Sequence, residues 1–223
     1  MIEIDFKKIE LEDKDLITHY FKHHTSRSCE RTFVNVYLWA RFYHVKFAEV
    51  EHTLVFRTED EDGFSFAYPA GEPENVKKAL DVLMVYSKER GVPFLMYTVT
   101  PDNFEYLEKW YPGRFEIEYV EGDADYVYES EKLATLSGKK LHSKRNHVNK
   151  FKIVYADRWS YEPISEDNLE ECVQTGLKWR NENGCEEDEE KNAELCVTLN
   201  SLRLFKELDL VGGALRVDGK IIA

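Results

Sequence analysis

The spacing of apolar residues changes from a helical period to a strand period early in the chain. Residues 13–24 and 30–39 carry apolar side chains three and four positions apart, which predicts two helices, and Ser28 can cap the second. Three short runs then alternate between apolar and polar side chains, at residues 45–50, 53–57 and 63–68. Because short polar turns join these runs, they predict an antiparallel meander of three strands.

The next part of the chain alternates helices with strands. A helix is predicted from Pro73 to about Arg90, because proline suits a first helical turn and Gly91 suits a helix end. The apolar run 94–99 is predicted to be a central strand. A helix at 102–110 and strands at 114–120 and 125–128 are predicted to follow. Strands joined through helices are parallel neighbours, so we predict an α/β fold (α+β, mixed sheet) with helices on both faces.

The second half of the chain repeats the opening of the first half. Residues 130–152 are predicted to form one or two helices. The elements predicted after them are strands at 152–155 and 159–163, helices at 165–180 and from 186–190 to about 208, and strands at 211–217 and from 220 onward. Asp218-Gly219 is typical of a type I′ hairpin turn. The predicted division is a first domain at 1–130, a basic linker helix at 131–152 and an incomplete second domain at 153–223.

The composition is that of an acidic protein with a packed core. The chain has 223 residues and a formal net charge of -13. An apolar share of 43% and an aromatic share of 13% exclude a disordered chain. A strongly acidic protein is not a nonspecific nucleic-acid coat, because phosphate binding needs concentrated lysine and arginine. A local basic site is still compatible with this net charge.

The cysteines and the N-terminus indicate the compartment. The 4 cysteines form no CxxC pair and match no zinc spacing, which predicts free thiols in a reducing compartment. Residues 1–10 contain no signal-peptide core, and no stretch approaches the ~20 apolar residues of a membrane span. We therefore expect a cytoplasmic protein.

The densest local charge in the sequence is basic. Residues 139–152, called the basic segment below, contain no acid, and their basic side chains are Lys139, Lys140, Lys144, Arg145, Lys150 and Lys152. Helical spacing puts Lys140, Lys144 and His147 near one face of a helix. Arg145 and Asn149 share another face. A basic segment on an acidic body can hold a phosphate-rich ligand through Coulomb attraction and helix-terminal amides.

Two structural alternatives stand beside the functional interpretations. The basic segment could be a solvated helix whose charges balance nearby acids such as Glu129 and Glu131. His19 and His23 have the i, i+4 spacing of a metal-binding pair. No HExxH glutamate accompanies them and no third ligand is identifiable, so no metal site is predicted.

Two stretches of the sequence resemble one protein family. Residues 126–151 combine an aromatic-rich strand, a leucine-x-Gly-Lys-Lys turn and an Arg-Asn helix. The positions that carry this pattern are Leu136, Gly138, Lys139, Lys140, Arg145, Asn146 and Asn149. Residues 28–39, SCERTFVNVYLW, look like a second signature. The chain is thus similar to bacterial proteins related to the C-terminal domain of phosphatidylglycerol lysyltransferases.

The resemblance implies tandem GNAT-like acyltransferase domains, of which the second copy is incomplete here. It also implies transfer of an aminoacyl group from charged tRNA to an amine or hydroxyl acceptor, often a lipid or a peptidoglycan precursor. One departure is that residues 69–73, PAGEP, stand where an acetyl-CoA-dependent enzyme carries a Q/R-x-x-G-x-G/A loop. The resemblance and the basic segment together predict a substrate- or phosphate-binding site at Lys139, Lys140, Lys144, Arg145, Asn146 and Asn149.

One function and two alternatives follow from the sequence. The first is an aminoacyl- or acyltransferase that binds aminoacyl-tRNA or acetyl-CoA through the basic segment and uses a lipid or a small amine as acceptor. The alternative function is a noncatalytic GNAT-like binding or regulatory module. A third hypothesis is that the chain is part of a longer protein. The sequence identifies no catalytic residue, because GNAT-type chemistry mainly positions an activated carbonyl against its acceptor.

Overall fold

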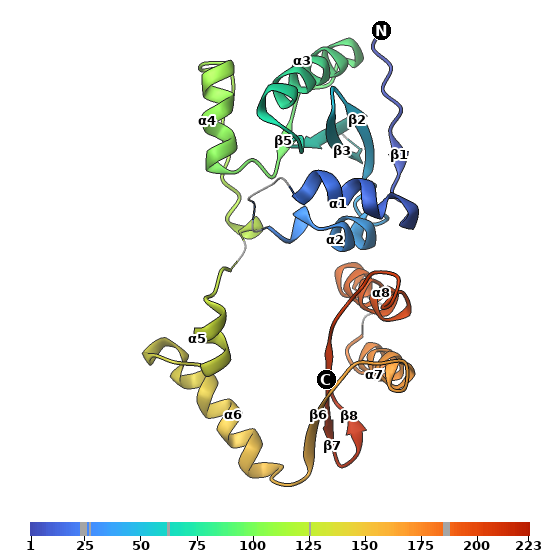
Figure 1. Cartoon of the computed structure of the whole chain (residues 1–223), viewed down its shortest axis with the longest axis vertical. Helices are drawn as coiled ribbons and strands as arrows, with labels where there is room; N and C mark the ends of the chain where they lie inside the picture. The colour runs from blue at the N-terminus through green and yellow to red at the C-terminus, as the bar shows by residue number, and fades with distance from the viewer. Residues whose placement is uncertain (23–25, 27, 62, 125, 185–187) are drawn as a thin grey trace. The chain divides into compact units, whose positions relative to one another are not determined.

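The computed structural model describes residues 1–22, 26, 28–61, 63–124, 126–184 and 188–223. The chain divides into two compact units, Met1–Val120 and Glu121–Ala223, each with its own sheet (Figure 1). Parts of four sequence predictions lie outside the described residues: the helix end at 23–24, the strand start at 125, Cys185, and positions 186 and 187 of the acidic run.

The first unit is built on a five-stranded sheet in the order β1-β2-β3-β4-β5. Its strands are β1 (Lys7–Lys8), β2 (Lys46–Val50), β3 (Thr53–Asp60), β4 (Gly63–Ala67) and β5 (Met96–Tyr97). Its helices are α1 (Lys14–Lys22), α2 (Phe33–Trp39), α3 (Pro73–Arg90) and α4 (Pro101–Trp110), with 3-10 turns η1 (Leu11–Asp13) and η2 (Cys29–Arg31). Neighbouring strands are antiparallel except for β4 and β5, which are parallel, so the predicted mixed sheet is confirmed.

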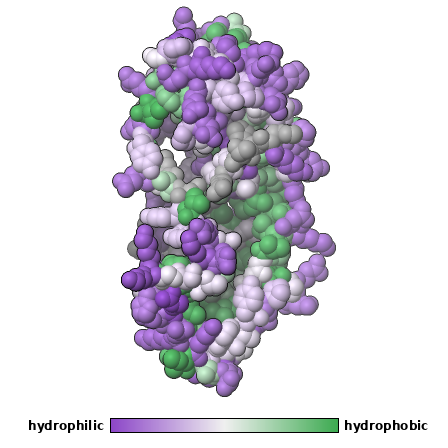
Figure 2. Space-filling view, turned by 60° about the vertical axis from the view of Figure 1, so that its left-hand side comes forward, coloured by the Kyte–Doolittle hydropathy of each residue, from purple (hydrophilic) through white to green (hydrophobic). Residues whose placement is uncertain are grey.

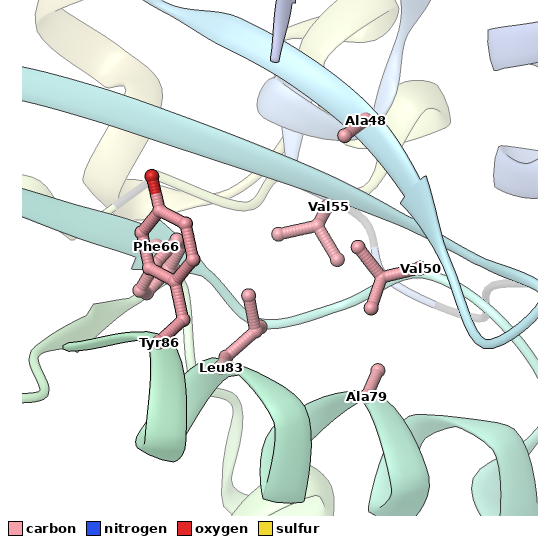
Figure 3. Close-up of a cluster of buried hydrophobic side chains, with 7 residues drawn as sticks. All are labelled: Ala48, Val50, Val55, Phe66, Ala79, Leu83 and Tyr86. Carbon is pink, nitrogen blue, oxygen red and sulfur yellow. The ribbon is translucent and has the colours of Figure 1, made fainter. Parts of the chain in front are cut away.

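One face of the first sheet packs on α3. Val55 of β3 and Phe66 of β4 lie in one apolar cluster with Ala79, Leu83 and Tyr86 of the helix. Figure 3 shows the helix side chains pointing toward those of the strands. Burying a side chain of this size contributes roughly 1.5–3 kcal/mol, so the apolar stripe of α3 fixes the helix to the sheet.

The opposite face of the sheet packs on α1. Side chains alternate between the two faces of a strand, so Phe56 points to the face opposite to that of Val55. The ring of Phe56 lies 5.7 Å from Phe21 of α1 and 6.2 Å from Phe47 of β2, measured between centroids. Figure 1 shows α3 on one side of the sheet and α1 with α2 on the other. The prediction of helices on both faces is therefore confirmed for this unit.

The second unit is built on a three-stranded antiparallel sheet in the order β6-β7-β8. Its elements are η3 (Glu121–Asp123), α5 (Ser130–Thr135), η4 (Lys139–Leu141), α6 (His142–Val154), β6 (Trp159–Pro163), α7 (Leu169–Glu182), α8 (Glu189–Arg203), β7 (Gly213–Val217) and β8 (Lys220–Ile221). Asp218 and Gly219 have φ of 52° and 77°, as a type I′ turn requires, so the predicted hairpin is confirmed.

The core of the second unit lies between α7, α8 and the sheet. Cys172 of α7 packs against Ala214 of β7 and Ile221 of β8. The next residue of α7, Val173, packs against Leu195 of α8, together with Leu199. The cysteine is buried, which raises the pKa of its thiol and makes it a packing residue.

In this part of the chain the strands predicted at 114–120 and 125–128 are wrong, and the strand predicted at 94–99 is shorter than predicted and not central. β5 comprises Met96–Tyr97 alone within the run 94–99, and it lies at the edge of the described sheet. Residues 114–120 and 126–128 pair with no described strand, and Ile117 and Tyr126 are 63% and 88% exposed. Apolar alternation defines a strand face but does not supply a partner strand. In Figure 2, green apolar side chains reach the surface between purple hydrophilic ones.

Helix boundaries also differ from the prediction, and α8 ends at Arg203 and not near 208. α6 continues through Val154, so the strand predicted at 152–155 is wrong, because adding a residue to an existing helix outweighs the weak strand preference of Ile153 and Val154. α7 begins at Leu169 and not at 165. The predicted second helix is interrupted at Thr32, whose hydroxyl caps α2.

Candidate functional site

The turn before α6 places the basic segment. α5 ends at Thr135; its C-cap, Leu136, has a left-handed φ of 51°, and Gly138 follows with φ of 91°. Two positive φ values so close together reverse the chain, and glycine adopts such a conformation at little steric cost. The leucine-x-Gly-Lys-Lys pattern is thus the turn that separates α5 from η4 and α6.

Arg145 holds this turn together. Its guanidinium donates hydrogen bonds to the carbonyl oxygens of Leu136 and, at 3.0 Å, of Gly138. Its other terminal nitrogen lies 3.4 Å from Nδ1 of His142, and the Asn146 side-chain nitrogen lies 3.3 Å from Nε2 of the same ring. Arg145 is half-buried. The structure therefore gives Arg145, and Asn146 through His142, a role in holding the turn.

The lysines of the predicted site, unlike Arg145, are exposed to solvent. Lys139, Lys140 and Lys144 are exposed, and so is Asn149. Gly138, Lys139, His142 and Arg145 line a shallow hollow of about 460 Å³. The structure thus brings the turn, Lys139 and Arg145 to one hollow, which Lys140 and Lys144 do not line, and Asn149 lies one turn further along α6.

The solvated-helix alternative predicts carboxylates beside the lysines. Glu129 instead pairs with Lys132 at 2.8 Å, and both residues precede the basic segment in the chain. Within the described ranges, Lys139, Lys140 and Lys144 form no ion pair and no side-chain hydrogen bond. Ammonium groups without a carboxylate partner are available to an external anion.

The first unit contains a second candidate site, a cavity of about 650 Å³. It lies where β4 ends and where α3 and α4 begin. Among its lining residues are Tyr68, Gly71, Glu72, Asp102, Tyr106 and Lys109. Pro73 starts α3, and a Thr100–Asn103 capping box starts α4, so both helices begin at defined residues beside the cavity.

A half-buried cation supports the wall of this cavity. The Arg31 guanidinium donates to the carbonyl oxygen of Tyr68 at 2.8 Å and lies 3.4 Å from the Thr98 hydroxyl. Burial lowers the pKa of Arg31 from its ordinary value, since a buried guanidinium loses hydration. Burial likewise raises the pKa of Tyr97, whose hydroxyl hydrogen-bonds the Thr58 hydroxyl at 2.8 Å. The Arg31 contacts tie the residues just after β4 and β5 to η2, and the Tyr97 contact ties β5 to β3.

Sequence reasoning missed the cavity residues. The signals present were the PAGEP run at 69–73 and the helix starts at Pro73 and Pro101. They fix two helix N-termini, but the parallel pairing of β4 with β5 is what brings those termini together. Among the residues that the structure describes, no group of three or more His, Cys, Asp or Glu side chains could hold a metal ion.

A comparison with known protein families shows which family the chain belongs to. The family model described as phosphatidylglycerol lysyltransferase, C-terminal, matches residues 21–223. The chain belongs to this family. Its place among the phosphatidylglycerol lysyltransferase C-terminal domains confirms the resemblance carried by residues 28–39 and 126–151. The description of the family names a transferase, the class expected from the sequence.

Two relatives extend the comparison. A crystal structure of a conserved protein of unknown function from Bacteroides thetaiotaomicron matches with a TM-score of 0.88 and 34% identity, over 98% of this chain and 73% of that chain. An uncharacterized protein of Mycoplasmoides gallisepticum is 31% identical over 90 residues, which are 40% of this chain. This match spans 29% of the length of the Mycoplasmoides protein. In the described part of this chain, none of the helices has the length and apolar character needed to cross a membrane.

Proposed function

We propose that this member of the lysyltransferase C-terminal family transfers an aminoacyl or acyl group from charged tRNA or CoA to an amine or hydroxyl acceptor. The observation that carries the proposal is the family match over residues 21–223. In such a transfer the acceptor nitrogen or oxygen bonds to the donor carbonyl carbon while the donor ester or thioester bond breaks. The acceptor proton passes to the departing oxygen or sulfur, so the protein's main task is to position the two substrates.

We place the donor on the basic segment. Lys139, Lys140 and Lys144 are exposed and have no carboxylate partner among the residues that the structure describes, and Arg145 and Gly138 fix the turn that presents them. A row of ammonium groups attracts phosphates of either donor and releases their counterions. Asn149, on the same helix, offers an amide for a further hydrogen bond.

Charged tRNA is the donor that the first unit favours. A CoA pyrophosphate needs backbone amides from a glycine-rich loop at a helix N-terminus. At the start of α3 the chain instead has Gly71 between Ala70 and Glu72, followed by Pro73, which has no amide hydrogen, and Glu74. Two carboxylates at this helix start repel a pyrophosphate. The tandem GNAT-like arrangement, the lipid or small-amine acceptor and a cytoplasmic location are part of the same proposal.

The test is donor binding by the full chain at low and moderate salt. Bulk aminoacyl-tRNA, uncharged tRNA and acetyl-CoA are compared on the wild type and on a Lys139→Ala, Lys140→Ala, Lys144→Ala variant. A matched control removes three exposed lysines of the first unit, Lys8, Lys78 and Lys88, and so changes the net charge equally. Release of free amino acid or formation of a new amide or ester in a mixed acceptor pool reports transfer.

We expect salt-sensitive aminoacyl-tRNA binding that the basic-segment variant loses and the control keeps. Acetyl-CoA binding without tRNA binding would reverse the donor assignment. Equal loss in both variants would show a net-charge effect and remove the basic segment as the site. Binding without any product from any donor would support the noncatalytic module instead.

A further inference from the structure

The cavity of the first unit adjoins a second hollow. The second has a volume of about 670 Å³ and shares Glu72, Pro73, Tyr106 and Lys109 with the first. We call the two together the α3–α4 groove, because residues of these helices line most of it. Figure 1 shows α3 and α4 next to each other in the first unit. Volumes of this order are those of small-molecule sites, which span ~300–1,000 Å³.

The charge of the groove is acidic and unbalanced. Glu72, Glu74, Asp102 and Glu105 contribute four carboxylates, and Lys109 is the single cation among the lining residues. Within the described residues, none of these four carboxylates forms an ion pair or a side-chain hydrogen bond. Like charges gathered without a partner create a negative potential that attracts a cation from solution.

The side chain of Tyr68 offers a hydrogen bond to a ligand in the groove. Tyr68 is 3% exposed and lines the cavity, yet its hydroxyl has no hydrogen-bond partner among the described residues. The hydroxyl oxygen is not among the fully buried, unpartnered side-chain atoms of the described residues, so it reaches the cavity and can hydrogen-bond water or a ligand there. Burial also raises the pKa of Tyr68 to about 12, which keeps the phenol neutral in solution near neutral pH.

Aromatic rings complete the lining. Tyr106 and Trp110 of α4 lie 5.2 Å apart between ring centroids, and both border the groove. Ring faces carry negative potential, so a cation above a ring is stabilised in addition to its pairing with a carboxylate. A hydrocarbon stem attached to the cation gains further stability by covering the same rings.

We propose that the α3–α4 groove binds a small organic cation, an alkylammonium, with its charge among the carboxylates of Glu72, Asp102 and Glu105 and its stem over Tyr106. Tyr68 accepts a hydrogen bond from the ammonium through its hydroxyl oxygen. An anionic ligand is disfavoured because four carboxylates oppose one lysine. The proposal goes beyond the proposed transfer reaction and does not depend on it, since it concerns ligand binding by the first unit.

The test uses three probes with the same six-carbon stem: n-hexylamine, 1-hexanol and hexanoate. Their binding to the full chain at neutral pH is measured by titration calorimetry, and the site is located by amide chemical shifts. A Glu72→Gln, Glu105→Gln variant removes charge while keeping shape, and Tyr68→Phe removes only the hydroxyl. The control, Glu116→Gln with Glu118→Gln, removes two exposed carboxylates of the same unit that do not line the groove.

We expect hexylamine to bind at least tenfold more tightly than hexanol, and hexanoate not to bind. The charge variant should weaken hexylamine binding about tenfold and Tyr68→Phe severalfold, while the control keeps the wild-type affinity. Equal binding of hexanoate and hexylamine, equal weakening by the control, or no hexylamine binding would each overturn the proposal. Thermal unfolding of every variant shows that loss of binding is not loss of fold. No tRNA is present, so these outcomes stand apart from those of the donor assay.

Discussion

Arg31 connects three segments of the first unit through one side chain. Its guanidinium bonds the Tyr68 carbonyl at 2.8 Å, lies 3.4 Å from the Thr98 hydroxyl and lies 5.8 Å from the centroid of the Phe21 ring. Thr98 has a left-handed φ of 53°, which is uncommon for a β-branched residue. A planar donor group is therefore placed to stabilise the chain just after β4 and β5, at the wall of the α3–α4 groove.

Replacing Arg31 with alanine should lower the stability of the first unit. Loss of hydrogen bonds from a charged donor costs about 2 kcal/mol, and the Tyr68 carbonyl loses its side-chain donor. Urea unfolding followed by tyrosine fluorescence measures the change. Arg114→Ala is the control, because Arg114 is exposed and its side chain forms no hydrogen bond or ion pair within the described part of the chain. Equal effects of the two substitutions would show that the buried contacts of Arg31 contribute nothing.

Gly71 is a second residue whose size matters. A Cβ at this position would lie 2.8 Å from Cγ2 and 3.2 Å from Cβ of Thr53, which is fully buried. Gly71→Ala should therefore destabilise the first unit by about 1–3 kcal/mol through overpacking. Gly122→Ala is the matched control, since a Cβ there meets nothing within 4 Å. Chemical denaturation of both variants checks the prediction, and equal stabilities would refute the close packing.

At the scale of elements, local signals predicted most helices and the meander. α3 has Pro73 at its start and Gly91 with φ of 69° at its end, and the sequence shows both. Strand pairing was harder to predict, because residues 94–99 and 114–120 show strand-like patterns while only Met96–Tyr97 pair in the described sheet. Which strand lies beside another depends on contacts distant in sequence, and a periodic pattern carries no such information.

In the second unit, one ion-pair network joins four elements. Arg216 of β7 donates to Glu162 of β6 at 2.9 Å and to Glu171 of α7 at 2.8 Å. Glu171 also accepts a hydrogen bond from the amide of Ile221 in β8 at 3.1 Å. Hydrogen bonds from Arg216 hold the pKa of both glutamates below their ordinary value of 4.5. The network therefore depends on both carboxylates being ionised.

This network predicts an acid-dependent loss of stability. A carboxylate whose pKa is lower in the folded state stabilises that state above its unfolded pKa, and the contribution is lost as the pH falls through the folded pKa. Wild type should therefore exceed Arg216→Met in urea stability at pH 7, and the difference should narrow as the pH falls below about 4.5, the ordinary glutamate pKa. Denaturation curves at pH 7, 5 and 3 test this. A difference that is constant over the range would mean that Glu162 and Glu171 are not coupled to Arg216.

At the scale of the whole molecule, charge is distributed unevenly along an acidic chain. The formal charge is -13, yet residues 139–152 contain no acid, while the α3–α4 groove is lined by four carboxylates. The basic segment could be found from the sequence, because its residues are consecutive. The groove could not, because Tyr68, Glu72 and Tyr106 come together only through the pairing of β4 with β5. The structure was also needed to show that Arg145 bonds the turn while Lys139, Lys140 and Lys144 are exposed.

This distribution of charge predicts how donor binding responds to salt. Each phosphate contact that a lysine makes adds about 0.7–0.9 to the slope of log affinity against log salt concentration, so loss of three contacts lowers the slope by about 2–3. The Lys139→Ala, Lys140→Ala, Lys144→Ala variant should show that decrease for aminoacyl-tRNA. Affinities measured at several salt concentrations between about 50 and 200 mM give the slope. The Lys8, Lys78 and Lys88 control should keep the wild-type slope, because those side chains lie in the first unit. If both variants change the slope equally, the tRNA senses the total charge of the chain, and α6 is not the contact surface.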